Sequence, residues 1–185
     1  FTFGSFNSFD KINEDVVSVW SKILKKIKNS KLVLKTSSIR HATERLKESF
    51  KKNGVLESIK FKNRDKELKD HLENYNDIDV ALDTFPYNGV TTSFEAIWMG
   101  VPVVTMAGYN FNSRCGESIN KNLNMEQLIA KDEDDYIQKV INLTNNHESY
   151  TNLRKSIFLN APTSPLFNSH DYSKSFFEAL EEIVK

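Results

Sequence analysis

Short apolar segments alternate with longer amphipathic segments along most of the chain, and this alternation limits the fold more than any other feature. Strands that alternate with helices form βαβ units, which build a parallel sheet. Because crossovers between parallel strands are right-handed, few topologies remain, and the doubly wound sheet is the commonest of them. We therefore expect an α/β, Rossmann-like, doubly wound parallel sheet with strand order 3-2-1-4-5 and C-terminal helices. The predicted strands are 1–7, 31–36, 58–62, 79–83 and 102–106.

The predicted helices are marked by the spacing of their apolar residues and by residues that favour helix ends. In the first of them Val16 and Trp20 lie on one face, and Asn13 can act as its N-cap. Gly54 and Gly100 follow later helices at the position that favours a left-handed cap. The predicted helices are 14–27, 39–53, 65–76, 91–99, 113–122, 133–145, 147–160 and 170–184, with a short apolar piece at 127–130.

The length and charge of the chain exclude several classes of function. Its 185 residues match one domain of ~100–200 residues. Lys+Arg and Asp+Glu are both 25, so no net positive field favours nucleic acid as a partner. The longest apolar run, 101–107, is far below the ~18 residues of a membrane helix, so no membrane partner is expected. The single cysteine, Cys115, favours a reducing compartment, and we predict a cytoplasmic location.

The two ends of the chain carry predictions about its organisation. The chain begins directly in a predicted strand without an initiator methionine, so we expect a piece of a longer protein. Residues 1–160 are predicted to form the Rossmann-like lobe. Pro162 and Pro165 predict an extended crossing after it. Residues 161–185 are expected to consist of this crossing and a C-terminal helix that packs on the lobe.

The topology predicts where a ligand would bind. In a doubly wound sheet, ligands bind beyond the carboxyl ends of the strands, where the strand order reverses. The loops at that point are 7–11, after the first strand, and 83–89, after the fourth. We therefore expect Lys11 to lie near the helix that starts after Gly89.

The start of that helix is the strongest local signal for a ligand. The segment Gly89-Val-Thr-Thr-Ser93 places hydroxyl groups and free backbone N–H groups at a helix N-terminus, which favours phosphate. Glu95, one turn further on, could accept hydrogen bonds from a ribose. The alternative is an ordinary helix cap, with Glu95 completing a capping box. The loop is neither a Walker loop nor G-x-G-x-x-G, so ATPase and nicotinamide chemistry have no support.

Other polar residues are weaker candidates. His71 and Arg114 follow strands at the same end of the sheet, although a surface position for His71 and a salt bridge for Arg114 are simple alternatives. Asp83 ends a strand and could cap its own turn. The four histidines are scattered, so no metal site is expected. Cys115 has no histidine base near it in the pattern.

Several segments in family order resemble one enzyme family. These are 6–12, 79–92, 95–105, 113–114 and 164–168, including Asp79-Val-Ala-Leu-Asp-Thr-Phe-Pro-Tyr-Asn-Gly89. They resemble the C-terminal half of the catalytic region of O-linked N-acetylglucosamine transferases, including bacterial relatives with tetratricopeptide repeats. The resemblance implies the second, nucleotide-sugar-binding lobe of the GT-B fold. It also implies transfer of N-acetylglucosamine from UDP-N-acetylglucosamine to Ser or Thr of proteins, with inversion and without a metal or other cofactor.

The resemblance also implies roles for individual residues. Lys11 matches the family lysine at the diphosphate and is the expected catalytic residue. Thr91 and Thr92 match the threonines that hold the phosphates, and Glu95 matches the acidic residue on the ribose. His71 would lie beside the uracil, whose edge would face the backbone around Asn63–Lys66. The expected substrate-binding set is Ser8, Lys11, Asn63, Lys66, His71, Gly89, Val90, Thr91, Thr92, Glu95 and Arg114.

Three positions depart from the family pattern. Val90 and Ser8 stand where the animal enzymes have a histidine and a glutamine, and Asn74 replaces an arginine. These departures are expected to affect which sugar is transferred and to leave the binding of the diphosphate intact. Alternatives are therefore a UDP-sugar epimerase, another GT-B transferase, a non-catalytic nucleotide-binding lobe, and a scaffold without a ligand.

The expected partners follow from the same reading. Without a metal, Lys11, the helix N–H groups and the two threonine hydroxyls would stabilise the charge that develops on the leaving phosphate. The protein acceptor and any base would be held largely by a missing N-terminal lobe, with repeats implied upstream. We expect the isolated piece to bind UDP without transferring sugar. Without the first lobe, aromatic residues at 87, 109 and 111 are expected to be exposed on the face of the cleft, and a dimer formed through them is a further expectation.

Overall fold

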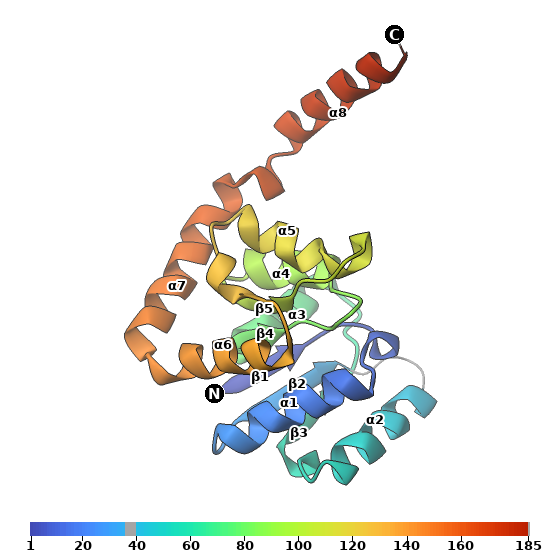
Figure 1. Cartoon of the computed structure of the whole chain (residues 1–185), viewed down its shortest axis with the longest axis vertical. Coiled ribbons are helices and arrows are strands. Elements are labelled where there is room, and N and C mark those ends of the chain that lie inside the picture. Colours follow the sequence, from blue (N-terminus) through green and yellow to red (C-terminus); the bar gives the residue numbers. More distant parts are fainter. Residues whose placement is uncertain (36–39, 185) are drawn as a thin grey trace.

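The computed structural model describes residues 1–35 and 40–184, and it shows a parallel sheet covered by helices (Figure 1). The sheet order in this part of the chain is β3-β2-β1-β4-β5-β6, which confirms the predicted fold class and the order of the first five strands. The sixth strand, Ile129–Ala130, is the end of the apolar piece at 127–130, which sequence reasoning did not place in the sheet. The strands are β1 (Thr2–Ser5), β2 (Lys31–Lys35), β3 (Ile59–Lys62), β4 (Val80–Leu82), β5 (Val103–Met106) and β6 (Ile129–Ala130).

Strand β1 lies in the middle of the sheet. Its Phe3 pairs in register with Leu32 of β2 on one side and with Val80 of β4 on the other. Phe3, Leu32 and Val80 are fully buried, as expected for parallel strands that are covered on both faces. This register brings the carboxyl ends of β1 and β4 to the same edge of the sheet, which is the edge that carries the candidate site.

Two sets of helices cover the sheet. The helices α1 (Glu14–Lys26), α2 (Arg40–Lys52) and α6 (Glu133–Asn145) form one layer, in which α1 contacts the other two. On the other side of the sheet, α4 (Thr91–Trp98) packs against α5 (Cys115–Lys121) (Figure 1). Helix α7 (His147–Asn160) contacts α4 and α6. Helix α1 begins where predicted, because the Asn13 side chain accepts a hydrogen bond of 2.9 Å from Val16 N–H.

Two predicted helices are shorter than expected. Instead of 65–76, the structure has α3 (Leu68–Glu73) followed by a 3-10 turn at Asn74–Asp77. The Asn74 side chain donates to the carbonyl of Asp70 and takes up an acceptor that a continuing helix would use. Instead of 113–122, a 3-10 turn at Phe111–Ser113 precedes α5, because Asn110 and Ser113 form a capping box there.

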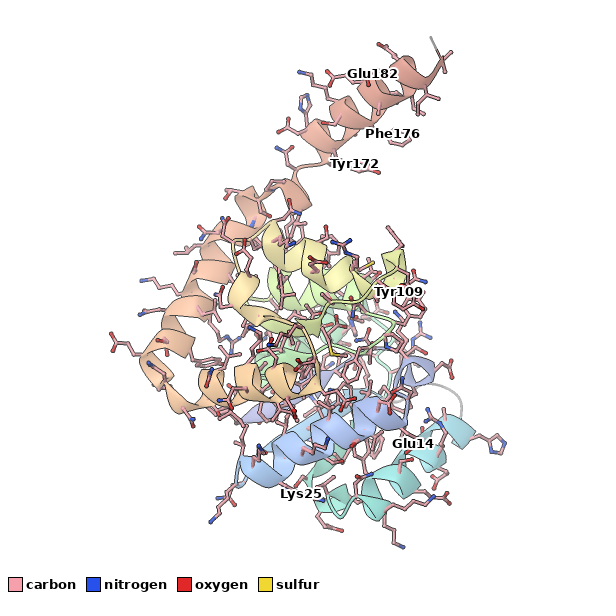
Figure 2. All side chains as sticks on the ribbon, in the orientation of Figure 1. Glu14, Lys25, Tyr109, Tyr172, Phe176 and Glu182 are labelled. Atoms are coloured by element: carbon pink, nitrogen blue, oxygen red, sulfur yellow. The ribbon has the colours of Figure 1, made fainter. Side chains whose placement is uncertain are left out.

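The last part of the chain differs most from expectation. The predicted extended crossing is wrong, because Ala161–Thr163 and Pro165–Phe167 are both 3-10 turns. Pro162 and Pro165 occupy first-turn positions, where the missing N–H of proline costs nothing. Helix α8 (Ser169–Val184) has no buried residue and projects away from the sheet (Figure 1), so the expected packing on the lobe is also wrong. Its Tyr172 and Phe176 point into open space (Figure 2). The boundary at 160 stays a prediction.

A single hydrophobic cluster fills the space between sheet and helices. Trp20, Tyr75 and Tyr136 are the largest of its fully buried side chains, and they come from α1, the turn after α3, and α6. Within the described residues, none of the helices combines the length and the apolar character that a membrane span requires.

Candidate functional site

Lys11 lies against the loop that leads into α4, as the topology predicts. It ends a 3-10 turn at Phe9–Lys11, and its Nζ donates a hydrogen bond of 2.9 Å to the carbonyl of Asn88. The same ammonium lies 4.0 Å from the centre of the Tyr87 ring. Partial burial lowers the pKa of Lys11, and the negative charge of Asp83 opposes this effect. The contact confirms the predicted juxtaposition of the first and fourth loops.

The buried carboxylate of Asp83 fixes the loop between β4 and α4 by accepting hydrogen bonds from it. Its Oδ1 accepts hydrogen bonds from the N–H of Gly89 at 2.6 Å and from the N–H of Thr84 at 2.9 Å, while Oδ2 accepts from Thr105 Oγ1 at 2.7 Å. The bond to Thr84 confirms that Asp83 caps its own turn. Burial raises the pKa of Asp83 to about 6, although these hydrogen bonds and the charge of Lys11 lower it. Asp83 therefore organises the loop without facing solvent.

Asn7 connects the first loop to α4. Its Oδ1 accepts a hydrogen bond of 2.8 Å from Thr92 Oγ1, and its Nδ2 lies 3.4 Å from Asp83 Oδ1. Asn7 is buried, so its amide is a fixed part of the site. A threonine hydroxyl has one proton, and in this arrangement the proton of Thr92 points to Asn7. To donate to a ligand, this hydroxyl would have to rotate.

The N-terminus of α4 has the composition of an anion site. Its N-cap residue, Val90, makes no side-chain hydrogen bond to the helix, and Thr91 and Thr92 begin the helix. Their N–H groups have no intrahelical acceptor because they lie in the first turn. The capping box weighed as an alternative is wrong, because the Glu95 carboxylate contacts His71 instead. The first turn therefore offers N–H donors and the positive end of the helix dipole.

Gly89 is required at its position for steric reasons. A Cβ there would lie 2.7 Å from Thr92 Oγ1, 2.8 Å from Ser93 Oγ and 2.9 Å from Asn7 Oδ1. These separations are too short for a carbon atom, so the loop can approach α4 this closely only with glycine.

His71 and Glu95 form a pair beside the start of α4. His71 Nε2 lies 2.8 Å from Glu95 Oε2, and Tyr75 donates to the same oxygen at 3.0 Å. Burial and the adjacent charge of Glu95 raise the pKa of Tyr75 well above its usual value, so this hydroxyl stays protonated. The prediction placed His71 and Glu95 at this edge, and the structure brings them into contact.

A charged cluster behind His71 was missed by sequence reasoning. Lys35, at the end of β2, is buried and contacts both the Asp65 carboxylate and His71 Nδ1. Asn74 donates to Asp65 at 2.7 Å and accepts from Lys62 Nζ at 2.7 Å. The one available signal was a lysine at the carboxyl end of an apolar strand, Lys31-Leu-Val-Leu-Lys35.

Four expected site residues lie at the rim of the site. Ser8 is exposed and bonds to Asp10 at 3.4 Å, and Asn63 and Lys66 are exposed in the loop after β3. Arg114 forms the salt bridge that was weighed against anion binding, with its Nε 2.8 Å from Glu117 Oε2. That ion pair and hydrogen bond raise the pKa of Arg114.

Val90 lines a cavity of about 530 Å³ between the starts of α4 and α5. Two other lining residues, Tyr109 and Phe111, are largely exposed, and Tyr109 projects at the rim of the molecule (Figure 2). In residues 1–35 and 40–184, no three His, Cys, Asp or Glu side chains are grouped closely enough to hold a metal ion.

Comparison with known proteins identifies the fold and the family of the chain. Alr3699/HepE of Anabaena, solved in complex with UDP and glucose, shares the fold with a TM-score of 0.69 at 12% identity, over 98% of this chain and 48% of its own. An O-GlcNAc transferase mutant of Thermobaculum terrenum gives a TM-score of 0.87 at 32% identity, over 99% of this chain and 35% of that protein. The fold, with its polar carboxyl edge, is that of the C-terminal lobe of a GT-B glycosyltransferase.

The family model of glycosyl transferase family 41 matches residues 1–176, and the chain belongs to that family. A relative from Arabidopsis thaliana, named probable UDP-N-acetylglucosamine–peptide N-acetylglucosaminyltransferase SPINDLY, is 35% identical over 193 residues. The match covers 100% of this chain and 20% of that relative. A tomato protein of the same name is 34% identical over 181 residues, and the match covers 19% of that protein's length. The chain thus spans about a fifth of the curated relatives that it matches.

Proposed function

We propose that this lobe binds the UDP part of UDP-N-acetylglucosamine, and that a longer protein containing it transfers the sugar to Ser or Thr of proteins. The observation that carries the proposal is the hydrogen bond from the Lys11 ammonium to the carbonyl of Asn88, in the loop that leads directly into the first turn of α4. A cation and unpaired N–H donors at one point are the groups that a diphosphate requires. The names of the relatives, and a solved neighbour in complex with UDP, support this choice of ligand.

The chemistry requires stabilisation of the leaving group. Breaking the bond between sugar and diphosphate places negative charge on the β-phosphate. In the proposal, Lys11 exchanges its bond to the Asn88 carbonyl for a phosphate oxygen, and the N–H groups of Thr91 and Thr92 donate to the same group. We propose that this replaces a metal and that the reaction inverts the anomeric centre. In the longer protein, losing one of these donors should raise the barrier by ~2–4 kcal/mol.

The nucleoside would lie beside the phosphates, on the side of α3. Glu95 is within one turn of Thr91 and would accept a ribose hydroxyl, and His71 would border the uracil. The exposed loop at 63–66 would contribute backbone groups to the edge of the base. An acceptor and a general base would be supplied by a further lobe, so we propose that the isolated chain binds UDP without transferring sugar. The free Cys115 agrees with a reducing, cytoplasmic location.

Calorimetric titration of the chain with UDP and with uridine tests the proposal. UDP should bind saturably, and Lys11→Ala should weaken it at least tenfold while leaving the weaker binding of uridine unchanged, because only UDP carries the diphosphate. Thr92→Val tests the adjacent helix start and should also weaken the binding of UDP. Lys25→Ala is the matched control, since Lys25 lies at the opposite end of α1 from Glu14 and the site (Figure 2).

Four outcomes would contradict the proposal. Absence of UDP binding to the wild-type chain, or equal loss of UDP and uridine in Lys11→Ala, would exclude the diphosphate site. Glycosylation of a peptide by the isolated chain would exclude the requirement for a further lobe. Consumption of UDP-N-acetylglucosamine without an acceptor would favour an epimerase.

A further inference from the structure

Lys35 is a buried cation next to the proposed donor site. Its side chain is only 6% exposed, and its Nζ forms an ion pair with the Asp65 carboxylate. The ammonium also contacts His71 Nδ1 and lies 5.4 Å from the centre of the Phe6 ring. A buried charge is costly unless its partners compensate for the lost water. The Asp65 carboxylate balances the charge, but it does not explain the contact with the imidazole.

The contact with Lys35 determines which nitrogen of His71 carries the proton. An ammonium group has three donors and no acceptor, so Nδ1 of His71 must be the acceptor. The proton of the neutral ring is then on Nε2, which donates to Glu95 Oε2 at 2.8 Å. A doubly protonated ring would place an N–H against the ammonium, which leaves two donors without an acceptor between them.

This tautomer orients Glu95 for a ligand. Nε2–H of His71 and the hydroxyl of Tyr75 both bind Oε2 of Glu95, at 2.8 and 3.0 Å. These two bonds leave Oε1 as an acceptor, on a side chain that is 19% exposed. If His71 carried its proton on Nδ1 instead, its bare Nε2 would face the carboxylate and repel it. The Glu95 side chain would then lose its fixed orientation.

We propose that Lys35 is a positioning residue of the donor site, which holds His71 in the Nε2–H tautomer so that Glu95 presents a free carboxylate oxygen to the ribose hydroxyls. The inference rests on the proposed UDP site and adds to it a residue that touches neither nucleotide nor sugar. The competing role for Lys35 is a purely structural one, in which it pairs with Asp65 and joins β2 to the loop after β3.

The first experiment reads the tautomer directly and requires no ligand. Histidine ¹⁵N chemical shifts distinguish a protonated from a bare ring nitrogen, and at pH 8 an ordinary histidine is neutral. We expect the Nε2–H pattern for His71 in the wild-type chain, and a mixture or the Nδ1–H form in Lys35→Met. An Nδ1–H pattern in the wild type, or an unchanged Nε2–H pattern in Lys35→Met, overturns the proposal. The wild-type spectrum decides even if Lys35→Met does not fold.

The second experiment asks whether Lys35 acts through the ribose contact. Calorimetry compares UDP with 2′,3′-dideoxy-UDP, which lacks the hydroxyls that Glu95 would bind. Lys35→Met should weaken the binding of UDP about tenfold and change the binding of the dideoxy compound less than twofold. The control is Lys62→Met, since Lys62 is paired in register with Lys35 but bonds to Asn74 and Asp77 rather than to His71. We expect this control to change the binding of both ligands by the same factor and to leave the His71 tautomer unchanged.

The outcomes separate this inference from the proposed function. If the wild-type chain binds UDP but Lys35→Met weakens both ligands equally, Lys35 is structural and only this inference fails. If the wild-type chain binds neither ligand, the donor site itself is wrong, and the role of Lys35 at a ribose fails with it.

Discussion

The hydroxyl of Thr92 donates a 2.8 Å hydrogen bond to Oδ1 of Asn7, a residue 85 positions earlier in the chain. Asn7 follows β1 and Thr92 begins α4, so this bond joins the two loops of the candidate site. Because Asn7 is buried, its carbonyl oxygen would have no replacement from bulk water if the hydroxyl were removed.

Replacing Thr92 therefore changes stability as well as ligand binding. Thr92→Val should lower the free energy of unfolding by ~1–3 kcal/mol, because a buried acceptor is left unpaired. Thr92→Ser keeps the hydroxyl and should stay within ~0.5 kcal/mol of the wild type. Urea denaturation measures both values, and a loss in Thr92→Ser without one in Thr92→Val would show that the methyl group rather than the hydroxyl matters.

Replacing Gly89 tests whether the loop before α4 must lie this close to the helix for UDP to bind. In Gly89→Ala the new Cβ would meet three polar atoms at 2.7–2.9 Å, so the loop must move away from α4, and UDP binding should fall at least tenfold. Gly54→Ala is the matched control. Gly54 has a φ of +69° with open space around it, so alanine there costs ~1–2 kcal/mol of stability, away from the site. Loss of UDP binding in both variants would mean that reduced stability is the cause.

Asp83 predicts a specific dependence of stability on pH. Its pKa is about 6 in the folded chain against an ordinary 3.8, so the folded state binds a proton more tightly than the unfolded state. The stabilisation is complete below pH 3.8 and is lost as the pH rises through 6, which amounts to about 3 kcal/mol. Asp83→Asn has no such titration. Urea denaturation between pH 4 and 7.5 should show the wild type losing about this amount relative to Asp83→Asn, and a constant difference would refute the assignment.

Helix α8 is expected to be only marginally stable in the described chain, because none of its residues is buried against the lobe. Its 16 residues bury nothing, and an isolated helix of this length has little stability in water. Hydrogen exchange in the helix should therefore be fast, while the amides of β1 and β4 are protected. A chain that ends at Asn168 should keep its free energy of unfolding within ~0.5 kcal/mol. Protected amides in α8 that become exchangeable on dilution would show instead that a second copy covers it.

The parts of the fold that the sequence predicts are those with a repeating pattern. Strands β1–β5 follow from short apolar runs, and their order is that of the doubly wound sheet, the commonest topology that right-handed crossovers allow. The meeting of Lys11 with the Asn88–Gly89 loop follows from the same rule, because it depends only on which strands are neighbours. Strand β6, with two residues, is too short to carry a pattern.

The parts that could not be predicted depend on side-chain contacts between distant elements. His71 was expected at the site, but its contact with Lys35, which pairs with Asp65, joins side chains from α3, β2 and the loop after β3 that no local pattern connects. The position of α8 could not be predicted for another reason. Its apolar residues at helical spacing, which include Tyr172, Phe176 and Leu180, indicate a buried face, yet nothing in the described chain covers them.

The central position of β1 has a consequence for the order of folding. Phe3 of β1 pairs with Val80 of β4, and Lys11 bonds to the carbonyl of Asn88. One edge of β1 therefore has no partner strand until β4 has been synthesised. On a translating ribosome β1 can pair with β2 well before its other edge is filled. That edge is apolar and would need protection from aggregation in the interval. Closing it is the same event that brings the loop after β4 to Lys11, so the pairing of β4 with β1 and the assembly of the candidate site are one step in the maturation of the chain.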